Sequence, residues 1–371
     1  MTDFVVVGGG IAGVSAAAFL SVHGSVSLFE AESSLAYHTS GRSAAMLVEN
    51  YGSDGARPLV KAARPFLENP PEGSVDAPLL SHRAVIWVAE EGGMPVLEQR
   101  AADAINRGAH CEVFAPEQVL DHVPVMDPHW LRGGLYEPSG ADIDVAALHQ
   151  AFVRIARSNE AQIHVDAPVR SVERTDSGWR VETDGHRVKA GALINAAGAW
   201  GDRIATLAGV GPLGLQPMRR TAFMVPGSEE SSRWPMVVEA NEQFYFRPDG
   251  VQFLCSLAEE EPSEPMDARP RMEDVALAIE RINEATTFEI RTVNSQWAGL
   301  RTFAPDRDLV IGEDPTAPGF YWLVGQGGIG IQTSPAYGAL LASLVVGTSL
   351  PDGFADVGVD PERTSPARFR T

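Results

Sequence analysis

The first thirty residues have the pattern of a strand, a glycine-rich turn, a helix, a second strand and an acid. The β-branched run 4–7 leads into Gly8, Gly10 and Gly13, which have G-x-G-x-x-G spacing, and Glu30 ends the second apolar run. In such a turn the glycines allow a tight bend, close approach of the backbone to a pyrophosphate, and close packing of helix on strand. The helix N-terminus offers free N–H groups to the phosphates, and the acid binds ribose hydroxyls. This pattern predicts a βαβ unit that binds an adenine dinucleotide, NAD or FAD.

The composition limits the class of protein and of partner. A length of 371 residues with 44% hydrophobic and 21% charged residues is typical of a globular protein with two or more domains. A net charge of −20 opposes binding to nucleic acid or to an anionic membrane, so we expect a small-molecule partner. An anionic substrate would then need local arginines.

Cysteine usage and hydropathy add further expectations. The two cysteines, Cys111 and Cys255, indicate no disulfide framework, and no residues have the spacing of a metal site, so no metal is expected. No apolar run has the length of a transmembrane segment, and the N-terminus has no basic region of a signal peptide. We expect a cytoplasmic protein.

A second glycine-rich turn lies near the other end of the chain. The strand-like run 319–324 leads into the glycines of residues 325–330, and a helical stretch follows at 334–346. A further apolar strand, 192–198, ends in small residues before another helix. Helices are also expected to start within 43–48, to follow an Asp144 cap at 145–156, and to span 272–285. The dipole of a helix near a flavin ring stabilises the negative charge of the reduced flavin. The second turn therefore favours FAD over NAD, in an α/β fold whose nucleotide domain is discontinuous.

Further motifs are spread over nearly the whole chain. They are Gly41-Arg42-Ser43-Ala44-Ala45, residues 138–144 (PSGADID), residues 195–200 (NAAGAW), residues 213–220 (LGLQPMRR), Phe244-Tyr245, residues 297–301 (WAGLR) and residues 326–333 (QGGIGIQT). Together they resemble the D-amino-acid oxidase/glycine oxidase superfamily of FAD-dependent oxidoreductases. Within it they are most similar to the bacterial D-arginine dehydrogenase group.

The resemblance implies a fold and a reaction. It implies a Rossmann-like FAD-binding domain of glutathione-reductase type, from residues 1–80, 140–215 and 302–371. A substrate domain with a mixed sheet is expected from residues 81–139 and 216–301. The family reaction oxidises an amine: hydride leaves the α-carbon for flavin N5, and the imine is hydrolysed to a keto acid and ammonia. The cofactor supplies the electron sink, and the protein positions the substrate.

Candidate substrate residues follow from the same resemblance. Arg301 and Arg220 would bind the substrate carboxylate, because a guanidinium fork matches its geometry, and Arg219 competes for the second role. Tyr245 and Tyr51 would close over the substrate, although each could be a core or rim aromatic. The carbonyl of Gly328 would accept the substrate amine with Gln332 beside it, and a plain helix cap is the alternative there.

Candidate cofactor residues lie at both glycine turns and between them. Val169 would be a strand residue that holds the adenine by its main chain, and Arg42 would meet the pyrophosphate or form a surface salt bridge. FAD is expected to be non-covalent, because relatives that tether it use a cysteine near the Arg301 segment and none is present there. The full set is Gly8, Gly10, Ile11, Ala12, Gly13, Glu30, Ala31, Arg42, Ser43, Ala44, Ala45, Val169, Ala197, Gly198, Trp200, Gly327, Gly328, Gly330, Ile331 and Gln332.

Two positions depart from the D-arginine dehydrogenase group. Val85 stands where that group has the glutamate that binds the substrate guanidinium, and Met46 stands where it has a histidine. A buried guanidinium that faced Val85 would lack its counter-charge. With Trp87, these residues predict an apolar pocket, unless they are only core.

The preferred interpretation is oxidative deamination of a D-amino acid with a neutral or hydrophobic side chain. Alternatives are a secondary amine of the sarcosine, proline or N-alkyl type, a 2-hydroxy acid, or an FAD-binding subunit without catalysis. The electron acceptor would be oxygen or a respiratory or quinone carrier.

Overall fold

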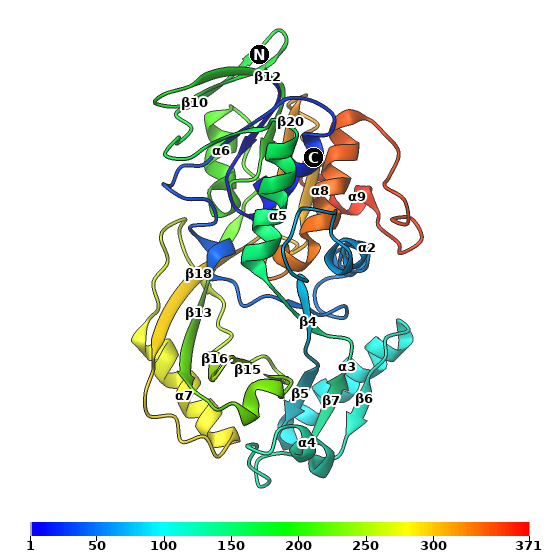
Figure 1. Cartoon of the computed structure of the whole chain (residues 1–371), viewed down its shortest axis with the longest axis vertical. Coiled ribbons are helices and arrows are strands. Elements are labelled where there is room, and N and C mark those ends of the chain that lie inside the picture. Colours follow the sequence, from blue (N-terminus) through cyan, green and yellow to red (C-terminus); the bar gives the residue numbers. More distant parts are fainter. Residues whose placement is uncertain (1, 371) are drawn as a thin grey trace.

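One half of the molecule is built around a sheet of eight strands (Figure 1). The computed structural model describes residues 2–370. The strands are β1 (Thr2–Val7), β2 (Val26–Phe29), β9 (Gln162–His164), β10 (Ser171–Thr175), β11 (Gly178–Glu182), β12 (Arg187–Asn195), β19 (Val310–Glu313) and β20 (Phe320–Val324). The central strand β1 pairs in parallel with β2 and β12, which pair in parallel with β9 and β20 respectively. β11 and β10 extend β12, and β19 extends β20, all antiparallel.

Alternation along β1 supplies both faces of this sheet with apolar side chains. Val6 packs with the helices of one face, and Val5 and Val7 pack on the opposite face with Trp179 and Trp322. The helices of the Val6 face are α1 (Ile11–Leu20), α2 (Ala56–Glu68), α5 (Val145–Ser158) and α8 (Gly330–Val346), whereas α6 (Gly201–Leu207) lies on the other face.

The second half contains a mixed sheet of nine strands. They are β5 (Val85–Ala89), β6 (Glu112–Phe114), β7 (Gly133–Glu137), β13 (Gln216–Pro226), β14 (Met236–Glu239), β15 (Tyr245–Asp249), β16 (Gln252–Ser256), β17 (Glu261–Pro262) and β18 (Ser295–Phe303). Only β14 and β5 pair in parallel. Its helices are α3 (Met94–Asn106), α4 (Pro116–His122) and α7 (Met272–Ala285).

Smaller elements connect the halves and complete the chain. A three-stranded sheet is formed by β3 (Met46–Leu47), β4 (Leu80–His82) and β8 (Ala141–Ile143). The remaining short helices are α9 (Pro361–Thr364), η1 (Thr39–Arg42), η2 (Glu91–Gly93), η3 (Gly198–Trp200), η4 (Glu230–Arg233) and η5 (Pro366–Phe369). Among residues 2–370, no helix is long and apolar enough to cross a membrane.

The expected α/β class is confirmed, and the local expectations that fail do so where long-range contacts decide. α7 spans 272–285 as expected, and Asp144 accepts a bond of 2.8 Å from the Ala147 N–H at the start of α5. The helix start expected at 43–48 is wrong, because this segment supplies β3, which pairs with β8. Val169 is also not on a strand, since β10 begins only at Ser171.

The division into two domains stays a proposal. The strands of the eight-stranded sheet come from within residues 2–29, 162–195 and 310–324, and those of the nine-stranded sheet from 85–137 and 216–303. We propose that these sheets mark the FAD-binding and substrate domains.

The first glycine turn has no room for side chains. Gly8 has φ +108°, a conformation that side chains disfavour, and a Cβ on Gly13 would lie 1.8 Å from the Gly8 carbonyl oxygen. We expect Gly13→Ala to lower the free energy of unfolding by about 3 kcal/mol, because α1 must move off β1. Denaturant unfolding would measure this. Gly185→Ala is the control, since a Cβ there meets nothing within 4 Å; an equal loss in both variants would contradict the explanation.

Candidate functional site

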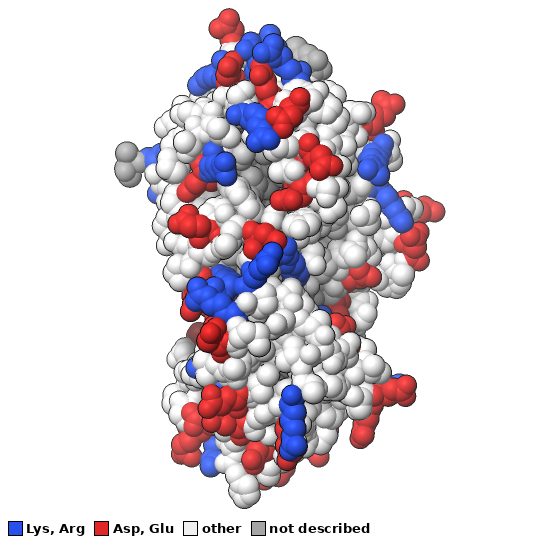
Figure 2. Space-filling model, turned by 90° about the vertical axis from the view of Figure 1, so that its left-hand side faces the viewer, with Lys and Arg blue, Asp and Glu red and all other residues white. Residues whose placement is uncertain are grey.

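One cavity of about 650 Å³ is lined by residues of both halves. All candidate residues named from the sequence line it except Gly13, which instead packs against Gly8, and Arg219, the competitor of Arg220. The face shown in Figure 2 carries acidic and basic side chains over both halves, and one group of basic side chains lies at the waist between them. The protein as a whole is strongly acidic, so the charge inside the cavity depends on the residues that line it.

The first glycine turn forms one part of the cavity wall. Gly10 precedes α1, and the first helical N–H, of Ile11, donates a bond of 2.9 Å to the Ser40 hydroxyl oxygen. A phosphate oxygen is an acceptor of the same kind. Glu30 directly follows β2, and its carboxylate accepts bonds from the Gly9 and Glu32 N–H groups at 2.6 and 2.9 Å. The glycine turn and the N-terminus of α1 fit the pyrophosphate of a dinucleotide, and the Glu30 carboxylate fits its ribose.

The second glycine turn packs on β18. A Cβ on Gly327 would lie 2.3 Å from the Phe303 ring, and one on Gly328 would lie 2.8 Å from the Arg301 guanidinium. These glycines thus leave room for two alternate side chains of β18. α8 begins directly afterwards at Gly330, so its N-terminus also lies at the cavity. Gln332 on this helix accepts a bond of 2.8 Å from the Val48 N–H.

Strand register brings two arginines to the same cavity. In the β13–β18 pair, Arg301 faces Met218 and Arg220 faces Gly299, so the two arginines lie diagonally on one face. Arg219 lies on the opposite face and pairs with Glu261 and Asp274 at 2.7 and 3.0 Å. This alternation selects Arg220 over Arg219 as the second cavity arginine.

The two cavity arginines differ in their partners. Among residues 2–370, no carboxylate lies within salt-bridge distance of Arg301. Arg220 donates a bond of 2.7 Å to the Glu259 carbonyl and lies 3.5 Å from a carboxylate oxygen of Glu260. Burial, and then the positive charge of Arg301, lower the pKa of Arg220. An anion bound between the two guanidinium groups would compensate for their lost hydration and would offset the repulsion between them.

An apolar wall completes the cavity on the side of the nine-stranded sheet. Met46, Val85 and Trp87 line it and belong to one buried cluster with Tyr245. The Trp87 indole N–H is bonded to the Glu137 carboxylate at 2.7 Å, so its polar group is satisfied. Ala222, Met236 and Val238 also line this wall, and sequence reasoning missed them.

Tyr51 also lines the cavity. Its hydroxyl oxygen lies 3.5 Å from a carboxylate oxygen of Glu242, a residue with a positive φ of +56° that the sequence reasoning also missed. No local pattern marks Glu242, Ser40 or Met236 in the sequence. Only chain topology brings them to the cavity.

Arg42 forms the salt bridge that was the alternative considered for it. Its guanidinium pairs with Asp267 at 2.5 Å and donates to the carbonyls of Ala268 and Ala298. Arg42 also lines the cavity, and its contact with the pyrophosphate stays a prediction. Val169 and Trp200 line the cavity from loop and η3 positions.

Comparison with known proteins gives the family. A family model described as FAD dependent oxidoreductase (DAO) matches residues 3–344. The chain belongs to this family. It is 24% identical over 405 residues to "FAD-dependent oxidoreductase domain-containing protein 1" of Bos taurus. The matched region covers 93% of this chain and 81% of that protein.

Two solved structures share the fold over nearly the whole chain. Glycine oxidase from Geobacillus kaustophilus has a TM-score of 0.86 at 22% identity and covers 99% of this chain and 98% of that one. L-proline dehydrogenase from P. horikoshii has a TM-score of 0.86 at 19% identity and covers 99% and 97%. The cofactor is FAD, and the protein is an FAD-dependent oxidoreductase.

The two neighbouring arginines of β13 predict opposite stability effects. Arg219→Met should lower the free energy of unfolding by about 3 kcal/mol, because it leaves Asp274 buried without its partner. Arg220→Met should change it by less than about 1 kcal/mol, because it also removes repulsion from Arg301. Urea unfolding of both variants checks this; the reverse order would contradict the assignment of the two faces.

His149 predicts a pH dependence of stability. Its Nε2 lies 3.0 Å from the Gly9 carbonyl, and burial lowers the pKa of His149 below its ordinary value of 6.5. The unfolded chain therefore takes up a proton before the folded chain does, so stability should fall as pH drops below 6.5 and stay level above it.

The variant His149→Gln isolates this contribution, because its amide can still donate to Gly9 while it does not titrate. We expect its unfolding free energy to depend less on pH between about pH 5 and 6.5, by up to about 1.4 kcal/mol per pH unit. Urea midpoints over this range measure the difference. Parallel curves for the two proteins would contradict the role of His149; His164 contributes in the same direction to both.

Proposed function

We propose that this protein uses FAD to oxidise the amine of a D-amino acid with a neutral or hydrophobic side chain. The observation that carries the proposal is Arg301, a guanidinium with no carboxylate partner among residues 2–370, in the wall of a cavity that is also lined by apolar side chains. A charge removed from water needs a counter-charge, and a substrate carboxylate would supply it.

Each group of residues would have a separate role. Arg301 and Arg220 bind the carboxylate, and Met46, Val85 and Trp87 receive the side chain. The Gly328 carbonyl accepts the substrate N–H, and Tyr51 and Tyr245 exclude water from the reacting carbon. FAD, when bound, supplies the acceptor for the hydride that leaves the α-carbon.

The cofactor would lie along the cavity between the two glycine turns. Gly8, Gly10, Ile11 and Ala12 would hold its pyrophosphate, and the second turn and the start of α8 would lie at its ring. We propose that FAD is not covalently attached, because neither Cys111 nor Cys255 lines the cavity.

A secondary amine is the second candidate substrate. The solved structure with a TM-score of 0.86 that is titled L-proline dehydrogenase favours it, because proline carries both a carboxylate and an apolar body. The same carboxylate clamp and apolar wall would receive an N-alkyl amino acid or proline. The name of that relative does not decide between the two.

A substrate panel tests the proposal. The FAD-loaded protein is mixed without oxygen with neutral D-amino acids, their L-enantiomers, D-arginine, sarcosine, proline and lactate, and flavin absorbance is followed. We expect bleaching by neutral D-amino acids and little by D-arginine, since Val85 offers no counter-charge. Bleaching only by sarcosine or proline would support the second candidate, and bleaching by no member would contradict both. Admission of air then shows whether oxygen accepts the electrons.

The clamp has its own test with the best substrate of that panel. Arg301→Ala should lower kcat/KM by about 100-fold, which corresponds to about 3 kcal/mol of lost transition-state binding. Arg291→Ala is the matched control, because that arginine is exposed and pairs only with Glu289. A near-normal kcat/KM for Arg301→Ala would remove Arg301 from the role.

A further inference from the structure

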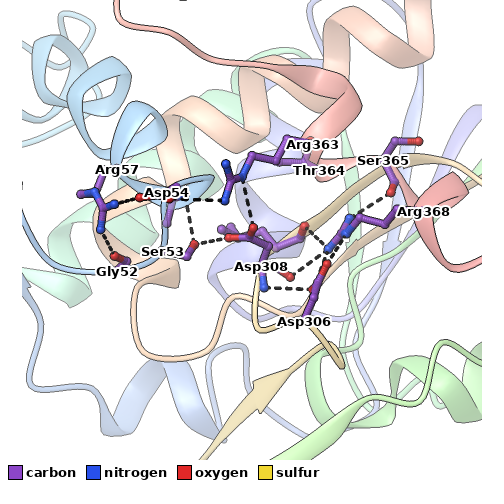
Figure 3. A network of polar contacts seen from close by, with 12 residues as sticks. Gly52, Ser53, Asp54, Arg57, Asp306, Asp308, Arg363, Thr364, Ser365 and Arg368 are labelled. Atoms are coloured by element: carbon purple, nitrogen blue, oxygen red, sulfur yellow. Dashed lines mark hydrogen bonds and ion pairs between the residues drawn. The ribbon is translucent and has the colours of Figure 1, made fainter.

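A polar network joins the segment that carries Tyr51 to the C-terminal end of the chain (Figure 3). The loop 48–55 connects β3 to α2 and places Tyr51 in the cavity wall. The Ser53 hydroxyl donates to a carboxylate oxygen of Asp308 and accepts a bond of 3.3 Å from the Ala56 N–H at the start of α2. Ser53 therefore fixes one end of the loop to Asp308.

Asp308 is itself held from the C-terminal side. Arg363 of α9 donates to its second carboxylate oxygen at 3.2 Å, and Arg368 donates to its backbone carbonyl at 3.1 Å. The Asp308 side chain is only 11% exposed. Figure 3 shows Asp308 between the Ser53 and Arg363 side chains. The segment 361–370 therefore holds the carboxylate that Ser53 contacts.

The contact between loop and anchor is closely packed. A Cβ on Gly55 would lie 2.9 Å from Asp308 Oδ1 and 3.0 Å from Arg363 Nε. Asp308 also lies in the connection 304–309 that directly follows β18, the strand that carries Arg301. The anchor of the Tyr51 loop and the strand of Arg301 are thus parts of one continuous segment.

The other end of the loop is fixed separately, and Tyr51 lies between the two ends. The Val48 N–H is bonded to Gln332 at 2.8 Å, and Asn50 is bonded to Glu137 at 2.7 Å. The Tyr51 hydroxyl lies beside the Arg301 guanidinium and at 3.5 Å from Glu242. Both of these contacts are made by the hydroxyl at the tip of the side chain, whereas the two ends of the loop hold the backbone that carries Tyr51.

We propose that Ser53 and Asp308 are positioning residues that hold Tyr51 against Arg301, with Arg363 orienting the Asp308 carboxylate. The inference rests on the proposed function, because it treats the Arg301 end of the cavity as the carboxylate site. A purely structural role, which would only hold the start of α2, makes different predictions below.

The first test follows the loop itself in the full-length, FAD-loaded protein. Ser53→Ala and Asp308→Asn should speed amide hydrogen exchange in residues 48–55 by about tenfold, the factor expected from one hydrogen bond to a charged group. Asp76→Asn is the control, because Asp76 is exposed and pairs with Arg154, outside this network. Unchanged exchange at 48–55 in both test variants would overturn the proposal, whatever the substrate is.

The second test uses benzoate as an apolar carboxylate probe, titrated by the change in the flavin spectrum. Ser53→Ala should raise the benzoate dissociation constant by about tenfold in the parent protein but by less than about twofold in the Tyr51→Phe background, because the effect passes through the Tyr51 hydroxyl. A structural role at α2 would give the same factor in both backgrounds, which would overturn the proposal. Failure of the parent protein to bind benzoate would count against the proposed function, and the exchange result then decides the positioning role.

Discussion

The unpaired charge of Arg301 is the constraint around which the cavity is arranged. A guanidinium in a protein interior loses much of its hydration, and a partner of opposite charge is needed to offset the free energy that this desolvation costs. In the described residues the nearby carboxylates serve Arg220 and Arg219 instead. The fold therefore leaves Arg301 without a carboxylate partner among these residues, next to Arg220, whose charge is partly neutralised by Glu260. Such an arrangement is unfavourable in an empty site and favourable around a bound anion.

The position of Arg301 also explains why the second glycine turn has no room for side chains. The sequence suggests that Gly327 and Gly328 are small so that the backbone can approach a flavin. The structure shows a further requirement, because Phe303 and Arg301 alternate on β18 and both face the turn. The Gly327 N–H is bonded to the Thr302 carbonyl at 2.9 Å, between them. A side chain at either glycine would displace Phe303 or Arg301 of β18, so the turn and the position of Arg301 depend on one another.

The sequence predicts those parts of the fold and site that local chemistry determines. The glycine spacing at Gly8–Gly13, the Asp144 cap and the apolar periodicity of 272–285 each depend on neighbours within one element. The prediction fails at 43–48 and at Val169, where pairing with distant segments or its absence decides the conformation. The family resemblance favours Arg220 over Arg219, but only the strand register gives the physical reason, and Ser53 meets Asp308 across 255 positions of sequence. No pattern within a window of the sequence contains such contacts.

The overall charge and the local charge of this protein act over different distances. The net charge of −20 is spread over the surface, where salt screens a charge beyond about 8 Å. Inside the cavity, Arg301 and Arg220 would meet the proposed carboxylate at contact distance and with little water between them, so their attraction would be larger than the screened repulsion. The acidic surface would then still allow a small carboxylate to bind, while it disfavours extended polyanions that would contact many surface positions at once. In the proposed function, selectivity for a small anion would follow from two cations that lie in an interior cavity rather than on the surface.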